Sequence, residues 1–354
     1  MKVTIKDVAR EANVATSTVS RVLSNSSKIS EDTKRKVNAA IKKLNYTPNV
    51  VARSLANNRT RILAMVLPQG ADRLFENPFF AHAMKGISVC AQQENYYIMY
   101  AFKEDNDEDW IKRFTESNIV DGLCLFNAKD NDEGIRYLKE KEFPFVIIGR
   151  PESVRDILWV DNDNFEAMYK LTQKLIDMGH RKIGFIGAKK HLNVAKDRLE
   201  GYKQGLFSRG IKINDDFIQL MNDFTEEEGY KATKNMILAD TPTAIVCTDD
   251  LLAFGSQKLL LEEGLTDVAM VGFNNTPLAE YQKVPLASVD INSEELGFYA
   301  TKLLIDKLEK KENNKRFYII DTKLVERKSL FERKQANGCT GCEKKRKMKE
   351  NEGK

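Results

Sequence analysis

Residues 4–56 read TIKDVAREANVATSTVSRVLSNSSKISEDTKRKVNAAIKKLNYTPNVVARSLA. Two short stretches with apolar residues at helical spacing are separated by a tight turn, and a longer third stretch follows them. Thr4 and Asp7 form a capping-box pattern at the start of the first helix, and Asn13 can take the left-handed conformation that the turn needs. Ser30 is a good N-cap for the third helix. The stretch therefore predicts a helix-turn-helix unit.

The second helix carries short polar side chains and an arginine opposite its apolar face. The side chains on this polar face are Thr16, Ser17, Ser20 and Arg21. Hydroxyl groups can bond to base edges or phosphates, and arginine can bond O6 and N7 of guanine together. A merely solvated surface is the alternative interpretation.

The charge distribution favours nucleic acid as the partner of this surface. Residues 1–61 hold 13 Lys and Arg against 4 Asp and Glu, a net charge of +9, and residues 331–354 hold 8 against 4, a net of +4. Because the whole chain carries +4, residues 62–330 carry −9. A basic head on an acidic body is typical of a nucleic-acid-binding protein.

A short helix is predicted over residues 49–57, opened by Pro48 and Asn49. It is too short to be stable alone. Leu55 is its one large apolar side chain that is a candidate for exposure, and packing against the rest of the protein is the alternative for it.

This N-terminal segment resembles the headpiece of the LacI/GalR family of sugar-responsive repressors. The matching motifs are TIKDVA at 4–9, TVSRVL at 18–23, LNYTPN at 44–49 and VARSLA at 51–56. The resemblance implies that Thr16, Ser17 and Arg21 read bases, and that Leu55 of a hinge helix enters the minor groove of DNA. Ala15 departs from the family, which often has Ser at the start of the recognition helix. The full set of expected DNA contacts is Thr4, Thr16, Ser17, Ser20, Arg21, Asn49, Ala52 and Leu55.

The remainder of the chain alternates short apolar runs with amphipathic helical stretches. Such alternation predicts an α/β fold with parallel sheets covered on both faces. The number of units is too large for one small sheet, so we expect two doubly wound subdomains with a break near residues 160–163 and a ligand cleft between them. The predicted strands are 62–67, 96–102, 122–126, 145–149, 182–187, 218–223, 244–247 and 268–273, and the predicted helices are 79–93, 165–178, 198–209, 227–238 and 250–263.

Signatures of enzymes, membrane proteins and metal sites are missing from the sequence. There is no G-x-G-x-x-G after a strand, no P-loop and no G-x-S-x-G elbow. The three histidines show no metal spacing, and no apolar run approaches 18 residues. We therefore expect a cytoplasmic protein that is not an enzyme, needs no cofactor or metal, does not contact membranes, and keeps Cys90, Cys124 and Cys247 reduced in its core.

The body resembles the same family from about residue 62 to 329. The matching motifs are NPFF at 77–80, VDNDN at 160–164, MGHRKIGFIG at 178–187, DRLEGY at 197–202, CTDDLLAFG at 247–255, VGFNNTPLA at 271–279 and PLASVDIN at 285–292. The resemblance implies a periplasmic-binding-protein-like fold in which the chain returns to the first subdomain near residues 290–292. The expected organisation is a helix-turn-helix domain at 1–48, hinge helix and linker at 49–60, an effector-binding and dimerisation domain at 61–330, and a basic disordered tail at 331–354.

The resemblance also implies an effector pocket. Its expected residues are Phe79, Phe80, Arg150, Arg198, Phe224, Asp249 and Asn274, most of which follow a predicted strand, while Arg198 is expected to open the 198–209 helix. Aromatic faces suit the apolar side of a sugar, and the polar groups suit its hydroxyls. Core packing of the two adjacent phenylalanines, a carboxylate partner for Arg198 and a capping role for Asp249 are the alternatives.

The sequence thus predicts a transcriptional regulator that binds a palindromic double-stranded DNA operator as a homodimer, most similar to maltose-operon repressors, with a maltose-like or other α-glucoside effector. The family resemblance places the dimer interface partly on helices 79–93 and 250–263. The alternatives are a DNA-binding protein with a phosphoprotein or purine-like corepressor, and a soluble sugar-binding protein. Cys339 and Cys342 form a lone C-x-x-C pair, which cannot complete a zinc site.

Overall fold

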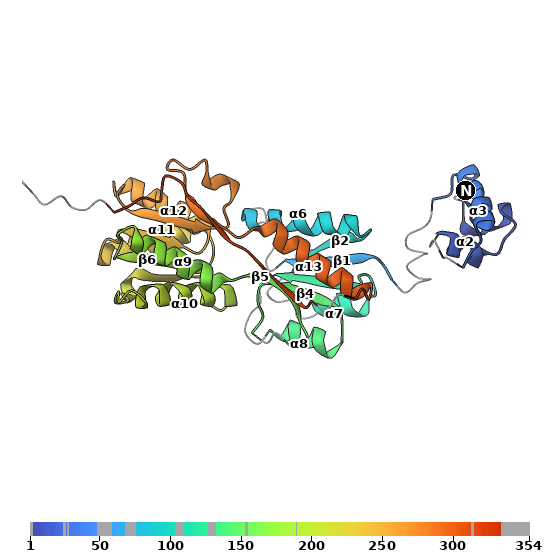
Figure 1. Cartoon of the computed structure of the whole chain (residues 1–354), viewed down its shortest axis with the longest axis horizontal. Helices are drawn as coiled ribbons and strands as arrows, with labels where there is room; N and C mark the ends of the chain where they lie inside the picture. The colour runs from blue at the N-terminus through green and yellow to red at the C-terminus, as the bar shows by residue number, and fades with distance from the viewer. Residues whose placement is uncertain are drawn as a thin grey trace, which may run out of the picture. The chain divides into compact units, whose positions relative to one another are not determined.

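The computed structural model describes residues 3–23, 26, 28–47, 59–67, 76–102, 110–126, 132–152, 155–188, 190–312 and 315–333. The chain forms two compact units, residues 1–61 and residues 62–354, which we call the headpiece and the body (Figure 1). The residues predicted to form the hinge helix, with Asn49, Ala52 and Leu55, lie outside the described residues. So do Cys339, Cys342 and the basic tail after residue 333.

The headpiece is a three-helix unit. Its helices are α1 (Ile5–Glu11), α2 (Thr16–Leu23) and α3 (Glu31–Lys43). The capping box of Thr4 and Asp7 is present, Asn13 has φ = 50° at the turn, and the Ser30 side chain accepts a hydrogen bond from the Thr33 amide. A small apolar core around Val8, Val19 and Val37 holds the helices together.

The first subdomain of the body is a parallel six-stranded sheet with helices on both faces. The strand order is β11-β5-β4-β3-β1-β2. Alternate residues of β1 pack on opposite faces, Leu63 and Met65 toward α6 and α13, and Ala64 and Val66 toward α7 and α8. Its elements are β1 (Ile62–Leu67), α6 (Pro78–Gln93), β2 (Tyr97–Phe102), α7 (Trp110–Glu116), β3 (Gly122–Phe126), α8 (Glu133–Glu140), β4 (Phe145–Ile148), β5 (Leu158–Asn162), α13 (Ser293–Leu308) and β11 (Phe317–Ile320).

The second subdomain repeats this plan with the strand order β12-β10-β9-β8-β6-β7. Every pairing is parallel except β10 with β12, so the expectation of parallel sheets is confirmed apart from this short antiparallel edge. Its elements are α9 (Asn164–Asp177), β6 (Ile183–Ala188), α10 (Asn193–Phe207), β7 (Ile218–Met221), α11 (Glu226–Ala239), β8 (Ala244–Cys247), α12 (Asp250–Glu262), β9 (Ala269–Phe273), β10 (Ala287–Asp290) and β12 (Lys323–Val325), with 3₁₀ turns at Asp215–Phe217 and Pro277–Ala279.

The chain passes between the two sheets three times: after β5, after β10, and between β11 and β12. One side chain ties these crossings together. The Nδ2 group of Asn162, which is buried, donates to the carbonyl oxygens of Ile291 and Ile320, each at 2.9 Å. Asn162 therefore lies where the three covalent links between the two sheets meet.

Helices α6 and α13 cross in close contact along one face of the first sheet (Figure 1). A Cβ atom at Gly86 would lie 1.8 Å from the Glu294 carbonyl oxygen, and one at Gly297 would lie 2.1 Å from that of Ala83. Only glycine allows the two backbones this approach. The crossing fixes the position of α6, whose N-terminus opens toward the second subdomain.

One expectation about a helix is wrong. The helix predicted at 198–209 begins at Asn193, so Arg198 lies in its second turn and does not open it. Its N-cap is Leu192, which makes no side-chain cap and therefore leaves no sequence signal. Helix α12 buries Asp250–Gln257 within its own subdomain, so any contact of α12 with a second chain is confined to its C-terminal part.

Among the described residues, no helix is long and apolar enough to cross a membrane. Cys90, Cys124 and Cys247 are buried and form no disulfide. Burial raises the pKa of each thiol to about 12, which keeps these side chains as inert core residues.

Candidate functional site

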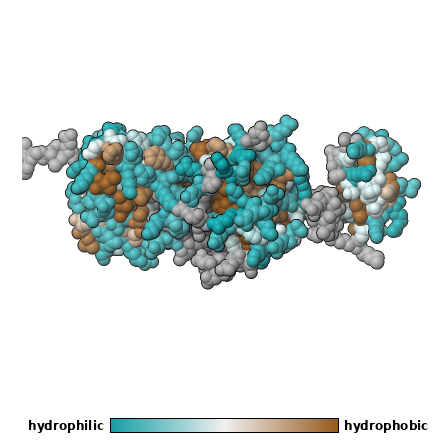
Figure 2. All heavy atoms as spheres, turned by 90° about the horizontal axis from the view of Figure 1, so that it is seen from below, coloured by the Kyte–Doolittle hydropathy of each residue, from teal (hydrophilic) through white to brown (hydrophobic). Residues whose placement is uncertain are grey.

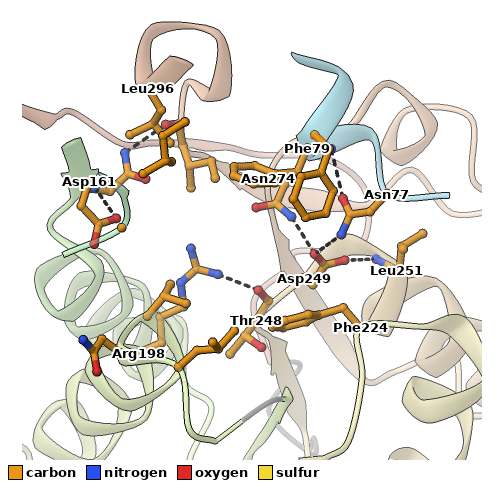
Figure 3. Close-up of a pocket in the computed structure, with 18 of the residues that line it drawn as sticks. Asn77, Phe79, Asp161, Arg198, Phe224, Thr248, Asp249, Leu251, Asn274 and Leu296 are labelled. Atoms are coloured by element: carbon orange, nitrogen blue, oxygen red, sulfur yellow. Dashed lines mark hydrogen bonds between the residues drawn. The ribbon is translucent and has the colours of Figure 1, made fainter. Parts of the chain in front are cut away.

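A cavity lies between the two subdomains of the body and contains about 1050 Å³ of space, open solvent at its mouth included. All seven residues predicted to contact a ligand line it: Phe79, Phe80, Arg150, Arg198, Phe224, Asp249 and Asn274. Five of them are labelled in Figure 3. They converge because β4, β8 and β9 run parallel within their sheets and their carboxyl ends open into the same cleft.

An aromatic wall comes from the start of α6. The Oδ1 atom of Asn77 accepts a hydrogen bond from the Phe79 amide at 3.0 Å and caps the helix, which turns Phe79 and Phe80 toward the cavity. Both rings pack edge-on against Phe126, with centroid distances of 6.1 and 5.4 Å. Both phenylalanines therefore pack against the core and also line the cavity, which Phe224 lines from the second subdomain. Figure 3 shows Phe79 and Phe224 on opposite sides of Asp249.

Asp249 is the N-cap of α12, but capping is only part of its role. Its Oδ1 atom accepts from the Leu251 amide at 2.7 Å, and its Oδ2 atom accepts from Asn77 Nδ2 at 3.0 Å and from Asn274 Nδ2 at 2.7 Å. Burial raises the pKa of Asp249 to about 6, against the effect of these donors. The Asp249 carboxylate thus holds the side-chain amides of Asn77 and Asn274 at the cavity.

Arg198 has no carboxylate as a direct partner among the described residues; its bonds go to neutral oxygens. Its Nε donates to Asn164 Oδ1 at 2.9 Å and its Nη1 to the Thr248 carbonyl oxygen at 2.6 Å. The guanidinium also lies 4.3 Å from the Phe273 ring centroid. Burial lowers the pKa of Arg198 to about 10, so the group stays charged at neutral pH. It points into the open part of the cavity (Figure 3).

Asp161 connects this guanidinium to the first subdomain. It accepts hydrogen bonds from the Arg150 amide at 2.8 Å and from Asn164 Nδ2 at 2.9 Å, and Asn164 in turn holds Arg198. Burial raises the pKa of the Asp161 carboxyl group. The arginine is therefore oriented by a hydrogen-bonded chain that starts in the other subdomain.

Arg150 lies at the rim of the cavity and its side chain is half exposed. Its Nη2 pairs with Asp197 at 3.0 Å, and its carbonyl oxygen accepts from Asn193 Nδ2 at 3.0 Å. Both partners belong to α10 of the second subdomain. In this conformation Arg150 therefore bridges the cleft at its edge.

The loop that presents Asn274 is strained and firmly held. Asn274 has φ = 101°, a conformation that is costly for side chains other than glycine, and Asn275 has φ = 47°, in the left-handed region that asparagine tolerates. Behind it, the buried carboxylate of Asp250 accepts from Ser288 Oγ at 2.6 Å and from the Thr276 amide at 2.7 Å. These bonds offset the strain and keep the Asn274 amide at the cavity.

Several lining residues escaped the sequence analysis, among them Asn77, Asp161, Asn162 and Thr248. The Asn-Pro pair at 77–78 was a helix-start signal and was open to recognition. Asp161 and Asn162 lie at the end of β5, a strand that the sequence analysis did not predict. Thr248 carried no signal. Its Oγ1 atom is buried without a hydrogen-bond partner among the described residues.

The headpiece carries the second group of predicted residues. Thr4, Thr16, Ser17 and Arg21 are exposed and Ser20 is partly exposed, while Val19 and Val22 face the core. Polar side chains on the first turns of α2 are thus available to a partner. Among the described residues of the chain, no group of histidine, cysteine and acidic side chains could hold a metal ion.

Family models match both units. Residues 4–49 match the model of bacterial regulatory proteins of the lacI family, and residues 172–330 match that of the periplasmic binding protein-like domain. The chain is also 38% identical, over 334 residues, to the transcriptional regulator MalR of Streptococcus pneumoniae serotype 4, covering 92% of this chain and 100% of that protein. The chain belongs to the LacI family. It is a DNA-binding transcriptional regulator, and its family is not one of enzymes.

Solved structures of LacI-family proteins share the fold. A transcriptional regulator CelR–cellobiose complex is 29% identical with a TM-score of 0.72 and covers 93% of this chain and 100% of that one. A structure named as a probable maltose operon transcriptional repressor, malR, from Staphylococcus aureus is 26% identical with a TM-score of 0.69, and covers 77% of this chain and 98% of that one.

Proposed function

We propose that this LacI-family regulator is a repressor of sugar-utilisation genes whose hold on its operator is changed by a neutral sugar bound between the two subdomains. The observation that carries the proposal is the convergence of the seven predicted residues on one cavity. Aromatic faces, a guanidinium and amides are the groups that bind the two sides of a sugar ring.

The charges around the cavity favour a neutral ligand over an anionic one. The lining includes four carboxyl groups, from Glu76, Asp161, Asp223 and Asp249, and two cations, from Arg150 and Arg198. An excess of carboxyl groups repels a phosphate, and Arg150 is already paired with Asp197. An anionic small-molecule corepressor is therefore disfavoured at this cavity.

The names of the relatives support a glucosyl disaccharide. MalR and a maltose operon repressor are among them, as is the complex of CelR with cellobiose. We propose maltose or a related α-glucoside as the effector.

In the proposed switch, the effector changes the angle between the subdomains about the three crossings at Asn162. This movement would separate the paired hinge segments near residues 49–57 and weaken the grip of the headpieces on a palindromic operator. Thr16, Ser17 and Arg21 are proposed to read bases, with Thr4, Ser20, Asn49 and Ala52 as further contacts and Leu55 as the minor-groove wedge.

A two-fold operator requires a dimer, and the body has apolar surface to form one. Large exposed apolar side chains lie on α6 and β2, at Val89, Tyr97 and Tyr100, and in the second subdomain at Leu278 and Tyr281. Figure 2 shows further apolar side chains gathered on the second subdomain, at the left. We propose that Val89, Tyr97 and Tyr100, together with Leu278 and Tyr281, form the dimer interface.

A thermal-shift comparison of maltose, cellobiose, ribose and hypoxanthine tests the effector. Maltose is expected to raise the melting temperature by mass action on the folded state, and then to change operator binding in a mobility-shift assay. A shift with ribose or hypoxanthine and none with maltose would overturn the proposed effector. Binding of maltose without any change at the operator would overturn the proposed switch.

A further inference from the structure

The two walls of the cavity are joined by a hydrogen bond from Asn77 to Asp249. Asn77 belongs to the first subdomain and Asp249 to the second, 172 residues away. The oxygen and the nitrogen of the Asn77 side-chain amide bond to different partners. Its Oδ1 atom caps α6 through the Phe79 amide, and its Nδ2 atom donates across the cleft to Asp249 Oδ2 at 3.0 Å. The residue that starts the helix also reaches the other subdomain.

The acceptor of this bond is shielded from water and shared with the cavity. Asp249 is 4% exposed, and the same Oδ2 atom accepts from Asn274 Nδ2 at 2.7 Å. Hydrogen bonds to a carboxylate are stronger than those between neutral groups, and low exposure strengthens them further. The oxygen of the Asn274 amide points away from Asp249, toward the open space of the cavity (Figure 3).

We propose that Asn77 is a positioning residue that clamps the two subdomains together over the cavity, with Asp249 as its acceptor and Asn274 as the link to the bound ligand. A ligand hydroxyl that donates to Asn274 Oδ1 would fix the amide that shares the acceptor with Asn77. Occupancy of the cavity and closure of the cleft are then coupled through one carboxylate. The inference rests on the proposed effector cavity, but the bond from Asn77 to Asp249 joins two side chains of the protein itself.

Two substitutions separate the clamp from the cap. Asn77→Ser keeps a good N-cap for α6 and removes the donor that crosses the cleft. Asn77→Asp also keeps the cap, but places a second carboxylate against Asp249. The double variant Asn77→Asp with Asp249→Asn restores a donor and an acceptor in exchanged positions, with the Asn274 amide turned so that its oxygen accepts the second N–H of the new amide. Asp132→Ser, at the N-cap of α8 in the same subdomain and away from the cavity, is the matched control.

Distance measurement by double electron–electron resonance reads closure without any ligand. Nitroxide labels go on cysteines at Glu140 of α8 and Lys234 of α11, both exposed. Cys339 and Cys342 are changed to serine, and the other three cysteines are buried. Labelled protein is diluted with unlabelled protein, so that only pairs within one chain contribute.

The expected result is a graded opening. Asn77→Asp should move the distribution to longer and broader distances, and Asn77→Ser should do so less. The double variant should return toward the distribution of the parent protein. The control Asp132→Ser should give the same distribution as the parent protein. Distributions for Asn77→Ser and Asn77→Asp that coincide with the parent would overturn the clamp. So would a double variant that opens as far as Asn77→Asp alone.

Calorimetric titration with maltose is the second readout. Asn77→Ser should weaken maltose binding at least fivefold, while Asp132→Ser should leave it unchanged. An unchanged affinity in Asn77→Ser contradicts the clamp. If maltose fails to bind the parent protein, the proposed effector is wrong, and the distance measurement alone decides the clamp.

Discussion

Arg21 and Asp250 show how a single side chain takes its role from its surroundings. Arg21 is exposed on the polar face of α2. Asp250 is fully buried behind the cavity, where it holds the strained loop after β9 through Ser288 and Thr276. The first residue is proposed to contact DNA, and the second holds the loop that shapes the cavity.

Replacing Arg21 by alanine should remove base recognition and leave the body intact. We expect a loss of about 1–3 kcal/mol in discrimination between operator and random DNA, with sugar binding unchanged. Competition mobility-shift assays measure the ratio. The control is Arg35→Ala, which removes an equal charge from the exposed face of α3. Equal weakening on both DNAs for Arg21→Ala would show that the residue contacts only phosphates.

Replacing Asp250 by asparagine should change how stability depends on pH. Burial raises the pKa of Asp250 from 3.8 to about 7, so the folded state binds the proton more tightly than the unfolded state. That contribution to stability is present below about pH 4 and is lost as the pH rises to about 7. Relative to the parent, Asp250→Asn should therefore gain stability between pH 5 and pH 8.

Urea unfolding at the two pH values measures this difference, with Asp216→Asn, at an exposed carboxylate, as the control for removing a charge. A difference between parent and Asp250→Asn that stays constant from pH 5 to pH 8 would contradict the assigned role of burial.

At the scale of elements, helix starts and helix crossings position the cavity walls. The cap at Asn77 starts α6 where Phe79 and Phe80 reach the ligand space. Its crossing with α13 through Gly86 and Gly297 sets the position of the whole helix. The local signals of α6 were readable, because Asn-Pro is a start signal, whereas the crossing depends on residues more than 200 positions apart.

Gly86→Ala should destabilise the body, because its Cβ would meet the Glu294 carbonyl oxygen at 1.8 Å and the backbones must separate. We expect about 1–3 kcal/mol of lost stability, the usual range for overpacking, and weaker sugar binding, since α6 carries two cavity residues. Thermal and urea unfolding measure the first effect. His82→Ala, exposed on the same helix, should change little, and a Gly86→Ala variant as stable as this control would refute the close crossing.

For the whole molecule, the arrangement that counts is two sheets joined by three crossings. Asn162 bonds to two of the crossings from the third. Any movement of one subdomain against the other must therefore change the backbone around the Asn162 side chain.

Asn162→Ala should leave two buried carbonyl groups without their donor and cost about 1–3 kcal/mol for each. We expect less cooperative unfolding of the two subdomains, seen as a broader or split transition in scanning calorimetry. Asn235→Ala, at an exposed position on α11, serves as the control. A single sharp transition at the parent temperature would contradict the role of Asn162 in tying the crossings together.

The sequence by itself determined the helix-turn-helix headpiece, the α/β class and eight of the strands, because capping, helical spacing and buried β-rich runs are local properties. The seven residues around the cavity came from the family resemblance, which carries positions over from one sequence to another. The sequence did not show β5 and β10–β12 as strands, the early start of α10, or the burial of α12 inside its own subdomain. Those features are decided by contacts between distant segments. The neutral partners of Arg198, the pairing of Arg150 with Asp197 and the shared acceptor Asp249 likewise exist only once the two subdomains face each other.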